Sequence, residues 1–219
     1  MSNSRIARSL PWAGLVVGVA ALGLQLFLTL PASLDAGRSL AGSIVFFLSF
    51  FTVLTNIGVV LTHAATLNFG GRLLAPLRTA PVRGGVAVAI AVVGIVYALV
   101  LAQTWQPEGL WHLADVLLHY VTPVLYLCWW LLSGRDGTLS VRHILIWLAW
   151  PAIYALYALA RAPLAGEVPY PFLDYAAHGW LHVALSMLAI FGLFVVIGAL
   201  VVVADRFSRN ADPSARTTG

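Results

Sequence analysis

Two ionisable side chains lie one helical turn apart in an apolar stretch near the middle of the chain. Asp115 and His119 are four residues apart in WHLADVLLHYVTPVLY, so a helix places them on one face. His119 lies roughly eight residues inside this stretch, about 12 Å along a helix. Pro123 removes a backbone hydrogen bond near His119 and can kink the helix there. The pair is interpreted as a functional site or, alternatively, as a polar link between helices.

A second group consists of hydroxyl and amide side chains in IVFFLSFFTVLTNIGVVLTHA. Ser49, Thr52 and Asn56 recur at spacings of three and four, which places them on one helical face, and Thr55 lies beside that face. Hydroxyl side chains in apolar helices usually bond their own backbone or a neighbouring helix. On spacing alone, Thr52 is therefore interpreted as a packing residue.

A third group, Asp174, His178 and His182, follows at four-residue spacing in YPFLDYAAHGWLHVAL. Asp174 could orient His178, or histidines at positions i and i+4 could share one metal ion. The third interpretation places Asp174 and His178 at a hydrated membrane interface, whereas His182 lies deeper in the apolar stretch.

The composition predicts which elements must position these side chains. Of the 219 residues, 61% are hydrophobic and only 9% charged, against about a quarter charged in a soluble domain. Lipid must therefore surround most of the chain, and we expect an all-α integral membrane bundle of six transmembrane helices. The apolar runs predict spans over 10–30, 40–64, 85–104, 113–132, 144–160 and 177–204. We expect one transmembrane domain over 1–207 and a short polar C-terminal tail over 208–219.

The arginines predict the orientation of these spans. The chain has twelve arginines and no lysine, and ten of the arginines fall on one side of the six-span arrangement. Only Arg38 and Arg161 fall on the other side. Because cytoplasmic loops carry the excess of positive charge, both termini are predicted to be cytoplasmic.

Three segments carry a resemblance to a known family. They are FFTVLTN at 50–56, LLHYVTPVLY at 117–126 and VPYPFLD at 168–174, in matching order and separation. With these segments the chain resembles the androgen-induced-gene family of multipass membrane proteins and its bacterial relatives. Animal members of that family are intramembrane hydrolases of fatty acid esters of hydroxy fatty acids, with a threonine nucleophile and a histidine. The resemblance implies an esterase of lipid metabolism in a bacterial plasma membrane.

The resemblance also implies which residues act. The threonine corresponds to Thr52, or to Thr55 if the local register shifts by three, and the histidine corresponds to His119. A histidine base can activate a threonine hydroxyl, and an acidic neighbour can orient the imidazole. Asp115 is the expected orienting residue, and Asn56 is the expected donor to the developing oxyanion. We expect a lipid substrate, no cofactor, no bound metal and no nucleic-acid partner.

Two other function classes stay open on the sequence. His119, His178 and His182 could hold a metal ion or haem inside the bundle. Alternatively, the polar residues could line the cavity of a lipid-binding or carrier protein without catalysis. Neither the oligomeric state nor the natural substrate follows from the sequence.

Overall fold

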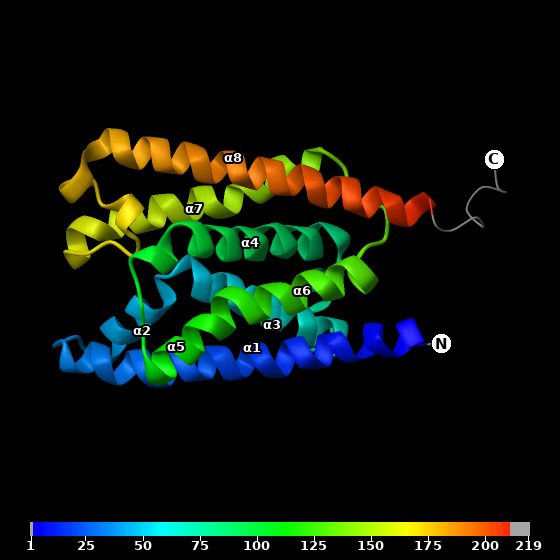
Figure 1. The fold of residues 1–219 in the computed structure, drawn as a ribbon, viewed down its shortest axis with the longest axis horizontal. Coiled ribbons are helices and arrows are strands. Elements are labelled where there is room, and N and C mark those ends of the chain that lie inside the picture. Colours follow the sequence, from blue (N-terminus) through cyan, green and yellow to red (C-terminus); the bar gives the residue numbers. More distant parts are fainter. Residues whose placement is uncertain (1, 211–219) are drawn as a thin grey trace.

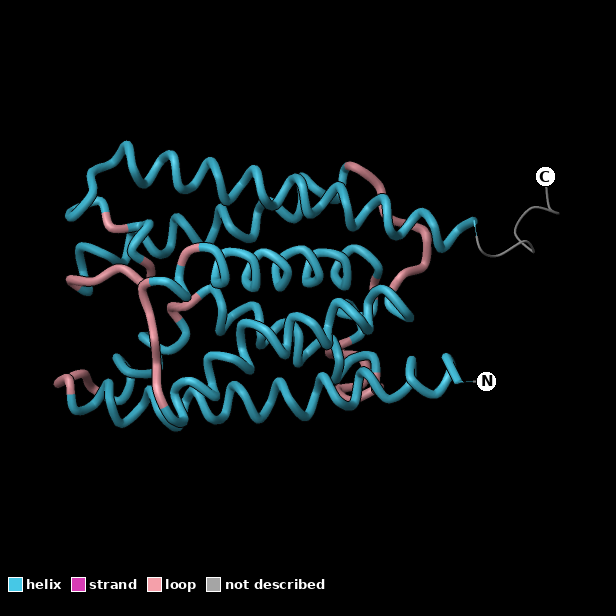
Figure 2. Tube along the Cα trace, viewed as in Figure 1, coloured by secondary structure: helices cyan, strands magenta, loops and turns pink. Residues whose placement is uncertain are grey.

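The computed structural model describes residues 2–210, and these fold into a bundle of long, roughly parallel and antiparallel helices (Figure 1). Figure 2 shows helix over nearly the whole described chain, joined by short loops and without a strand in that part. The helices are α1 (Ser2–Asp35), α2 (Leu40–Leu48), α3 (Phe51–Thr66), α4 (Ala80–Leu99), α5 (Gly109–Val116), α6 (Thr122–Trp129), α7 (Arg142–Ala165) and α8 (Tyr175–Asn210).

Five of the described helical segments are long and apolar enough to cross a membrane. They are Ser9–Asp35, Ala80–Gln103, Gly109–Gly134, Arg142–Ala165 and Tyr175–Ser208. Each contains most or all of a span expected from the sequence, which confirms an all-helical fold with several potential membrane spans. The predicted tail begins inside α8, which continues to Asn210, and residues 211–219 of that tail lie outside the described part of the chain.

The span predicted over 40–64 is not one continuous helix. Helices α2 and α3 together have the length and hydropathy of a span, but they meet at an angle of 78°. The break falls at Ser49 and Phe50, and Phe50 has extended backbone angles (φ −92°, ψ 127°). No proline or glycine occurs there, so the sequence offers no local signal for the break.

The first and last described helices give the bundle two distinct ends. Helix α1 begins and α8 finishes at the same end, here called the terminal end (Figure 1). The opposite end, here called the distal end, carries the α1–α2 loop, the α4–α5 loop and the segment before α8 (Figure 1).

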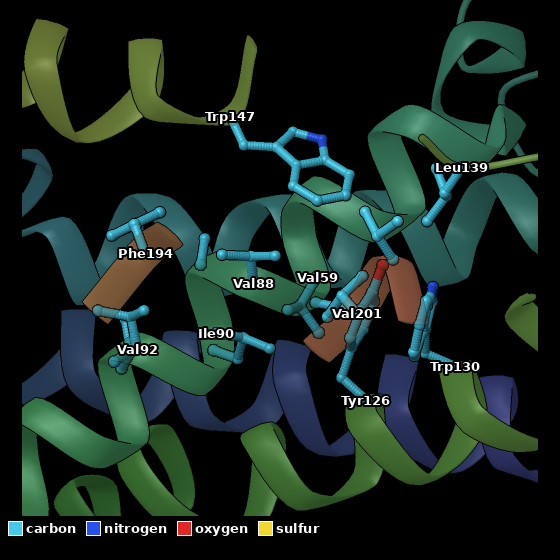
Figure 3. Packing of buried hydrophobic residues seen from close by; sticks show 14 of the residues in the cluster. Val59, Val88, Ile90, Val92, Tyr126, Trp130, Leu139, Trp147, Phe194 and Val201 are labelled. Atoms are coloured by element: carbon cyan, nitrogen blue, oxygen red, sulfur yellow. The ribbon is translucent and has the colours of Figure 1, made fainter. Parts of the chain in front are cut away.

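The hydrophobic core is centred on α4, which lies in the middle of the bundle (Figure 1). Figure 3 shows Val88, Ile90 and Val92 of α4 among side chains from neighbouring helices, including Tyr126 of α6 and Phe194 of α8. All five are buried. In a lipid environment such close packing, rather than exclusion of water, holds helices together.

Small residues bring α1 close to α3. A Cβ atom added at Gly14 would lie 2.3 Å from Nε2 of His63, and one at Gly18 would lie 2.6 Å from Val60. Gly14 and Gly18 are four residues apart, the small-xxx-small spacing that lets two helices approach closely.

At the terminal end, a buried carboxylate holds the loop that follows Gly134. The Oδ1 atom of Asp205 in α8 accepts from the backbone N–H of Asp136 at 3.1 Å, and Oδ2 accepts from that of Leu139 at 2.9 Å. Arg83 of α4 also pairs with Asp136 at 2.9 Å. These contacts connect the helices at the end where most of the described arginines lie.

Candidate active site

A cavity of about 590 Å³ lies in the distal half of the bundle. This volume is within the range of small-molecule sites in proteins. The surface that its wall exposes is largely apolar, although ten polar side chains line it. These polar residues are Thr52, Tyr97, Asp115, His119 and Tyr170, together with Gln25, Thr29, Ser33, Arg38 and Thr104.

The break between α2 and α3 places Thr52 at the start of a helix. Thr52 is the second residue of α3, and its side chain is buried against the cavity wall. The first N–H groups of a helix have no partner within that helix, and the helix dipole adds positive potential there. A negative charge that develops on or beside the Thr52 oxygen is therefore stabilised by its position.

Three tyrosine hydroxyls satisfy the polar groups that the break exposes. The hydroxyl of Tyr154 donates to the carbonyl oxygen of Ser49 at 2.9 Å, and that of Tyr157 lies 2.7 Å from the Ser49 hydroxyl. The backbone N–H of Thr52 donates to the hydroxyl of Tyr170 at 3.2 Å. Buried backbone groups that leave the helical pattern require such partners, because their apolar surroundings supply none.

The Tyr170 hydroxyl also lies 3.3 Å from Oγ1 of Thr52. Tyr170 is buried, and its ring stacks on Phe172 with centroids 5.0 Å apart. Burial raises the pKa of Tyr170 above its usual value, while the hydrogen bonds with Thr52 act in the opposite direction. The phenol therefore stays protonated at neutral pH and has one proton to donate into the site.

The histidine of the site lies in a π-helical turn, Leu117–Val121, between α5 and α6. Such turns insert an extra residue and often occur at functional sites. The turn ends two residues before Pro123, so the sequence correctly located a departure from regular helix near His119. Gly94 of α4 packs on this turn, since a Cβ atom there would lie 3.3 Å from the carbonyl oxygen of His119.

Asp115 and His119 form the pair that their spacing predicts. Nδ1 of His119 lies 2.9 Å from the carbonyl oxygen and 3.2 Å from Oδ1 of Asp115. A carbonyl oxygen only accepts hydrogen bonds, so Nδ1 carries the proton in this arrangement. The other ring nitrogen, Nε2, is then left with a free lone pair and can act as a base.

Tyr97 completes this group from α4. Its hydroxyl donates to Oδ2 of Asp115, and its ring stacks on the imidazole of His119 with centroids 3.9 Å apart. The Asp115 carboxylate, which is nearly inaccessible, thus has partners on both oxygens. Within the described part of the chain, no direct hydrogen bond joins Thr52 to His119; the two side chains share the cavity wall.

The cavity distinguishes Thr52 from Thr55. Thr55 is buried away from the cavity wall, and its hydroxyl has no hydrogen-bond partner within residues 9–208. Asn56 does not line the cavity either. Its Nδ2 group donates to the carbonyl oxygens of Thr52 and Leu118 at 2.9 and 3.3 Å. The arrangement therefore gives Asn56 a structural task in place of the expected donation to an oxyanion.

The group at Asp174, His178 and His182 is not brought to the cavity. Oδ1 of Asp174 accepts from two backbone N–H groups in the first turn of α8 and so caps that helix. Gly179, with φ of +80°, interrupts the helix between the histidines. Both imidazoles are exposed on the outside of the bundle, with ring centroids 4.9 Å apart. His182 therefore faces away from the interior of the bundle.

The histidines expected in the metal or haem alternative do not converge. His119 faces the cavity, whereas His178 and His182 lie on the outer surface of α8. Over residues 9–208, no three side chains of histidine, cysteine, aspartate or glutamate come close enough to hold one metal ion.

Two residues of the site, Tyr97 and Tyr170, were not predicted from the sequence. Tyr97 occurs in an apolar run without polar neighbours, so nothing in its surroundings indicates a role. Tyr170 lies between two predicted spans, where the sequence does not show that it is buried beside Thr52. Its signal was the segment VPYPFLD, in which Tyr170 is one of the resembling residues.

Comparison with protein-family models, with curated proteins and with solved structures finds no match to this chain. The resemblance therefore depends on the three sequence segments alone. Fold and cavity together define a class: an all-α bundle, compatible with an integral membrane protein, that holds a hydroxyl, an Asp–His pair and two tyrosines in an apolar cavity.

Proposed function

We propose that this chain is an intramembrane hydrolase of lipid esters, with Thr52 as nucleophile and His119 as general base. The observation that carries the proposal is the shared cavity. Thr52, in the first turn of α3, and His119, whose Nδ1 is held by Asp115, both line this cavity. Fatty acid esters of hydroxy fatty acids, or similar lipid esters, are the proposed substrates, since the cavity is apolar.

The proposed setting is a bacterial plasma membrane, with six spans and both termini in the cytoplasm. In this arrangement α2 and α3 form one broken span, and the distal end faces outward. The two arginines on the outer side, Arg38 and Arg161, bond to the two carboxylate oxygens of one residue, Glu167, at 2.5 and 3.1 Å. Because a carboxylate partner offsets part of their charge, these exceptions are consistent with the rule that cytoplasmic loops are positive.

In the first half of the proposed reaction, Oγ1 of Thr52 attacks the ester carbonyl carbon while Nε2 of His119 takes its proton. The resulting imidazolium is stabilised by Asp115 through Nδ1. The carbonyl π electrons move to oxygen, and the oxyanion lies near the positive end of α3. The bond to the alcohol oxygen then breaks, that oxygen receives the proton from His119, and an acyl-threonine remains.

In the second half, water attacks the acyl-threonine and gives one proton to Nε2 of His119. The tetrahedral intermediate collapses to the carboxylic acid, and Oγ1 of Thr52 takes the proton back. Tyr170 supports both halves by donating to Oγ1 or to the oxyanion, because its hydroxyl lies 3.3 Å from Oγ1. One water is consumed, and the enzyme returns to its starting state.

The experiment measures hydrolysis of a fatty acid ester of a hydroxy fatty acid by the purified protein in lipid nanodiscs. Thr52→Ala should abolish turnover, and His119→Ala should lower kcat about 10²- to 10⁴-fold, the usual contribution of a general base. Thr55→Ala is the matched control, since this threonine shares the helix but not the cavity. It should keep nearly full activity.

A second readout identifies the nucleophile directly. A fluorophosphonate probe should add to wild type and to Thr55→Ala at Thr52, as located by peptide mass spectrometry, and should not add to Thr52→Ala. Folded wild-type protein that hydrolyses no ester and takes up no probe would refute the proposal. Equal activity in Thr52→Ala would refute the assignment of the nucleophile.

A further inference from the structure

Arg38 gives the apolar cavity one positively charged wall position at its distal end. Of the described side chains that line the cavity, it is the one arginine; the others are apolar, aromatic, uncharged polar, acidic or histidine. Its guanidinium lies 4.4 Å from the ring centroid of Phe46, another wall residue, which holds it against the cavity by a cation–π contact.

The charge around Arg38 is not balanced. Glu167 accepts from Arg38 through Oε2 and from Arg161 through Oε1, so two guanidinium groups share one carboxylate. The three side chains together carry a net charge of about +1. An arginine has five N–H donors, and within the described residues Arg38 has a hydrogen-bond acceptor only in Glu167. Donors of Arg38 are therefore available to a further anion.

Helix α1 continues this polar surface along the cavity. Gln25, Thr29 and Ser33 follow at four-residue spacing, and all three line the cavity. The Ser33 side chain is 2% exposed, and its hydroxyl has no hydrogen-bond partner within residues 9–208. An unpartnered buried hydroxyl in a cavity wall is costly without a ligand. The unpartnered Ser33 hydroxyl is independent of Arg38, and it also indicates a polar ligand group beside α1 in this cavity.

We propose that Arg38 binds the anionic headgroup of an amphiphilic lipid, a carboxylate or a phosphate, at the distal end of the cavity. The apolar part of the lipid then lies along the aromatic wall, with Thr29 and Ser33 beside its polar end. This assignment deepens the proposed function, on which the interpretation of the cavity as a substrate site rests. It makes Arg38 the residue that selects acidic lipids over neutral ones.

The test measures binding without catalysis, in a Thr52→Ala background in nanodiscs of neutral lipid. The probe is an ω-brominated fatty acid at a pH where it is ionised, and the readout is quenching of tryptophan fluorescence, because Trp105 and Trp111 line the cavity. The corresponding ω-brominated alcohol is the neutral control, and an ω-brominated alkyl phosphate is the second headgroup. Inorganic phosphate, added as a competitor, shows whether the anion alone suffices.

Two substitutions separate anion recognition from a structural ion pair. Arg38→Gln should weaken binding of the brominated acid about tenfold or more, the usual size of one charge-assisted hydrogen bond. Glu167→Gln should tighten it, because two arginines then lack their shared carboxylate. Binding of the alcohol should change little in either variant.

If the Arg38–Glu167 pair only holds the loops together, both substitutions should weaken binding alike, and that result would overturn the proposal. Equal affinity for the acid and the alcohol, or no quenching by either, would also overturn it. The test stands apart from ester hydrolysis. Turnover can fail while acid-selective binding persists, and neutral esters can be cleaved while Arg38 selects nothing.

Discussion

Replacing Tyr170 by phenylalanine tests whether a single hydroxyl supports both the helix break and the proposed nucleophile. The ring contacts are conserved in Tyr170→Phe, including the stack on Phe172 and the edge contact with Phe50 at 6.0 Å. The change removes the acceptor for the Thr52 backbone N–H at 3.2 Å and the partner of Oγ1 at 3.3 Å. Both lost interactions are therefore made by a single atom, the hydroxyl oxygen of Tyr170.

The magnitude follows from burial of the groups left behind. A buried N–H without an acceptor costs about 1–3 kcal/mol, so we expect the free energy of unfolding to fall by that amount. An equal loss of transition-state stabilisation lowers kcat by about 5- to 150-fold. KM should change little, since the apolar wall that holds the lipid is the same in both proteins.

The assay combines ester turnover with thermal unfolding of the purified protein in one detergent. Tyr175→Phe is the matched control. Tyr175 lies at the same end of the bundle and stacks on Trp180 at 4.4 Å, and no partner of its hydroxyl is found within residues 9–208. It should retain wild-type kcat and melting temperature. A Tyr170→Phe protein with unchanged kcat, or one in which only KM rises, would refute the role given to the hydroxyl.

Three further predictions test the bundle and the pair that holds the base. Gly14→Ala should destabilise the protein by about 1–3 kcal/mol, because the new methyl group would lie 2.3 Å from Nε2 of His63; Gly23→Ala, with nothing within 4 Å, should not lower the melting temperature. Asp205→Ala should lower the free energy of unfolding by about 2–6 kcal/mol, because it leaves two backbone N–H groups of the loop after Gly134 without an acceptor. Faster proteolysis of that loop would report the loss. Asp115→Asn should reduce kcat about 10²- to 10⁴-fold in a folded protein, because His119 would no longer be held in the orientation that a general base requires. An unchanged kcat would exclude Asp115 as the residue that orients His119.

Composition and periodicity sufficed for most of the fold. A chain with 9% charged residues cannot cover a water-facing surface, and runs of about 20 apolar residues between glycine, proline and arginine are readily recognised. The exception is the second predicted span, over 40–64. The helix breaks at Ser49 and Phe50, although no proline or glycine occurs there. The side chains that stabilise the break come from α7 and from the segment before α8, which are distant in the sequence.

The site was predictable where its residues are neighbours in the sequence. Asp115 and His119 are one turn apart on one helix, so spacing alone placed them together. Thr52 was separated from Thr55 only by the direction of each side chain relative to the cavity. His182 shows the opposite failure: its depth in an apolar run suggested a buried ligand, yet it faces outward. Periodicity locates a face of a helix, but not whether that face meets protein or lipid.

The break between α2 and α3 connects stability to the proposed chemistry. A continuous helix would satisfy its own backbone groups, whereas the break leaves the Ser49 carbonyl and the Thr52 N–H to be satisfied by tyrosines. In return, Thr52 occupies the first turn of α3, where the helix dipole favours an oxyanion. Tyr154 and Tyr170 thus hold in place a residue more than a hundred positions earlier in the chain. We therefore expect substitutions at these two tyrosines to affect stability and turnover together, while substitutions of packing residues away from the cavity, such as Gly14→Ala, affect stability alone.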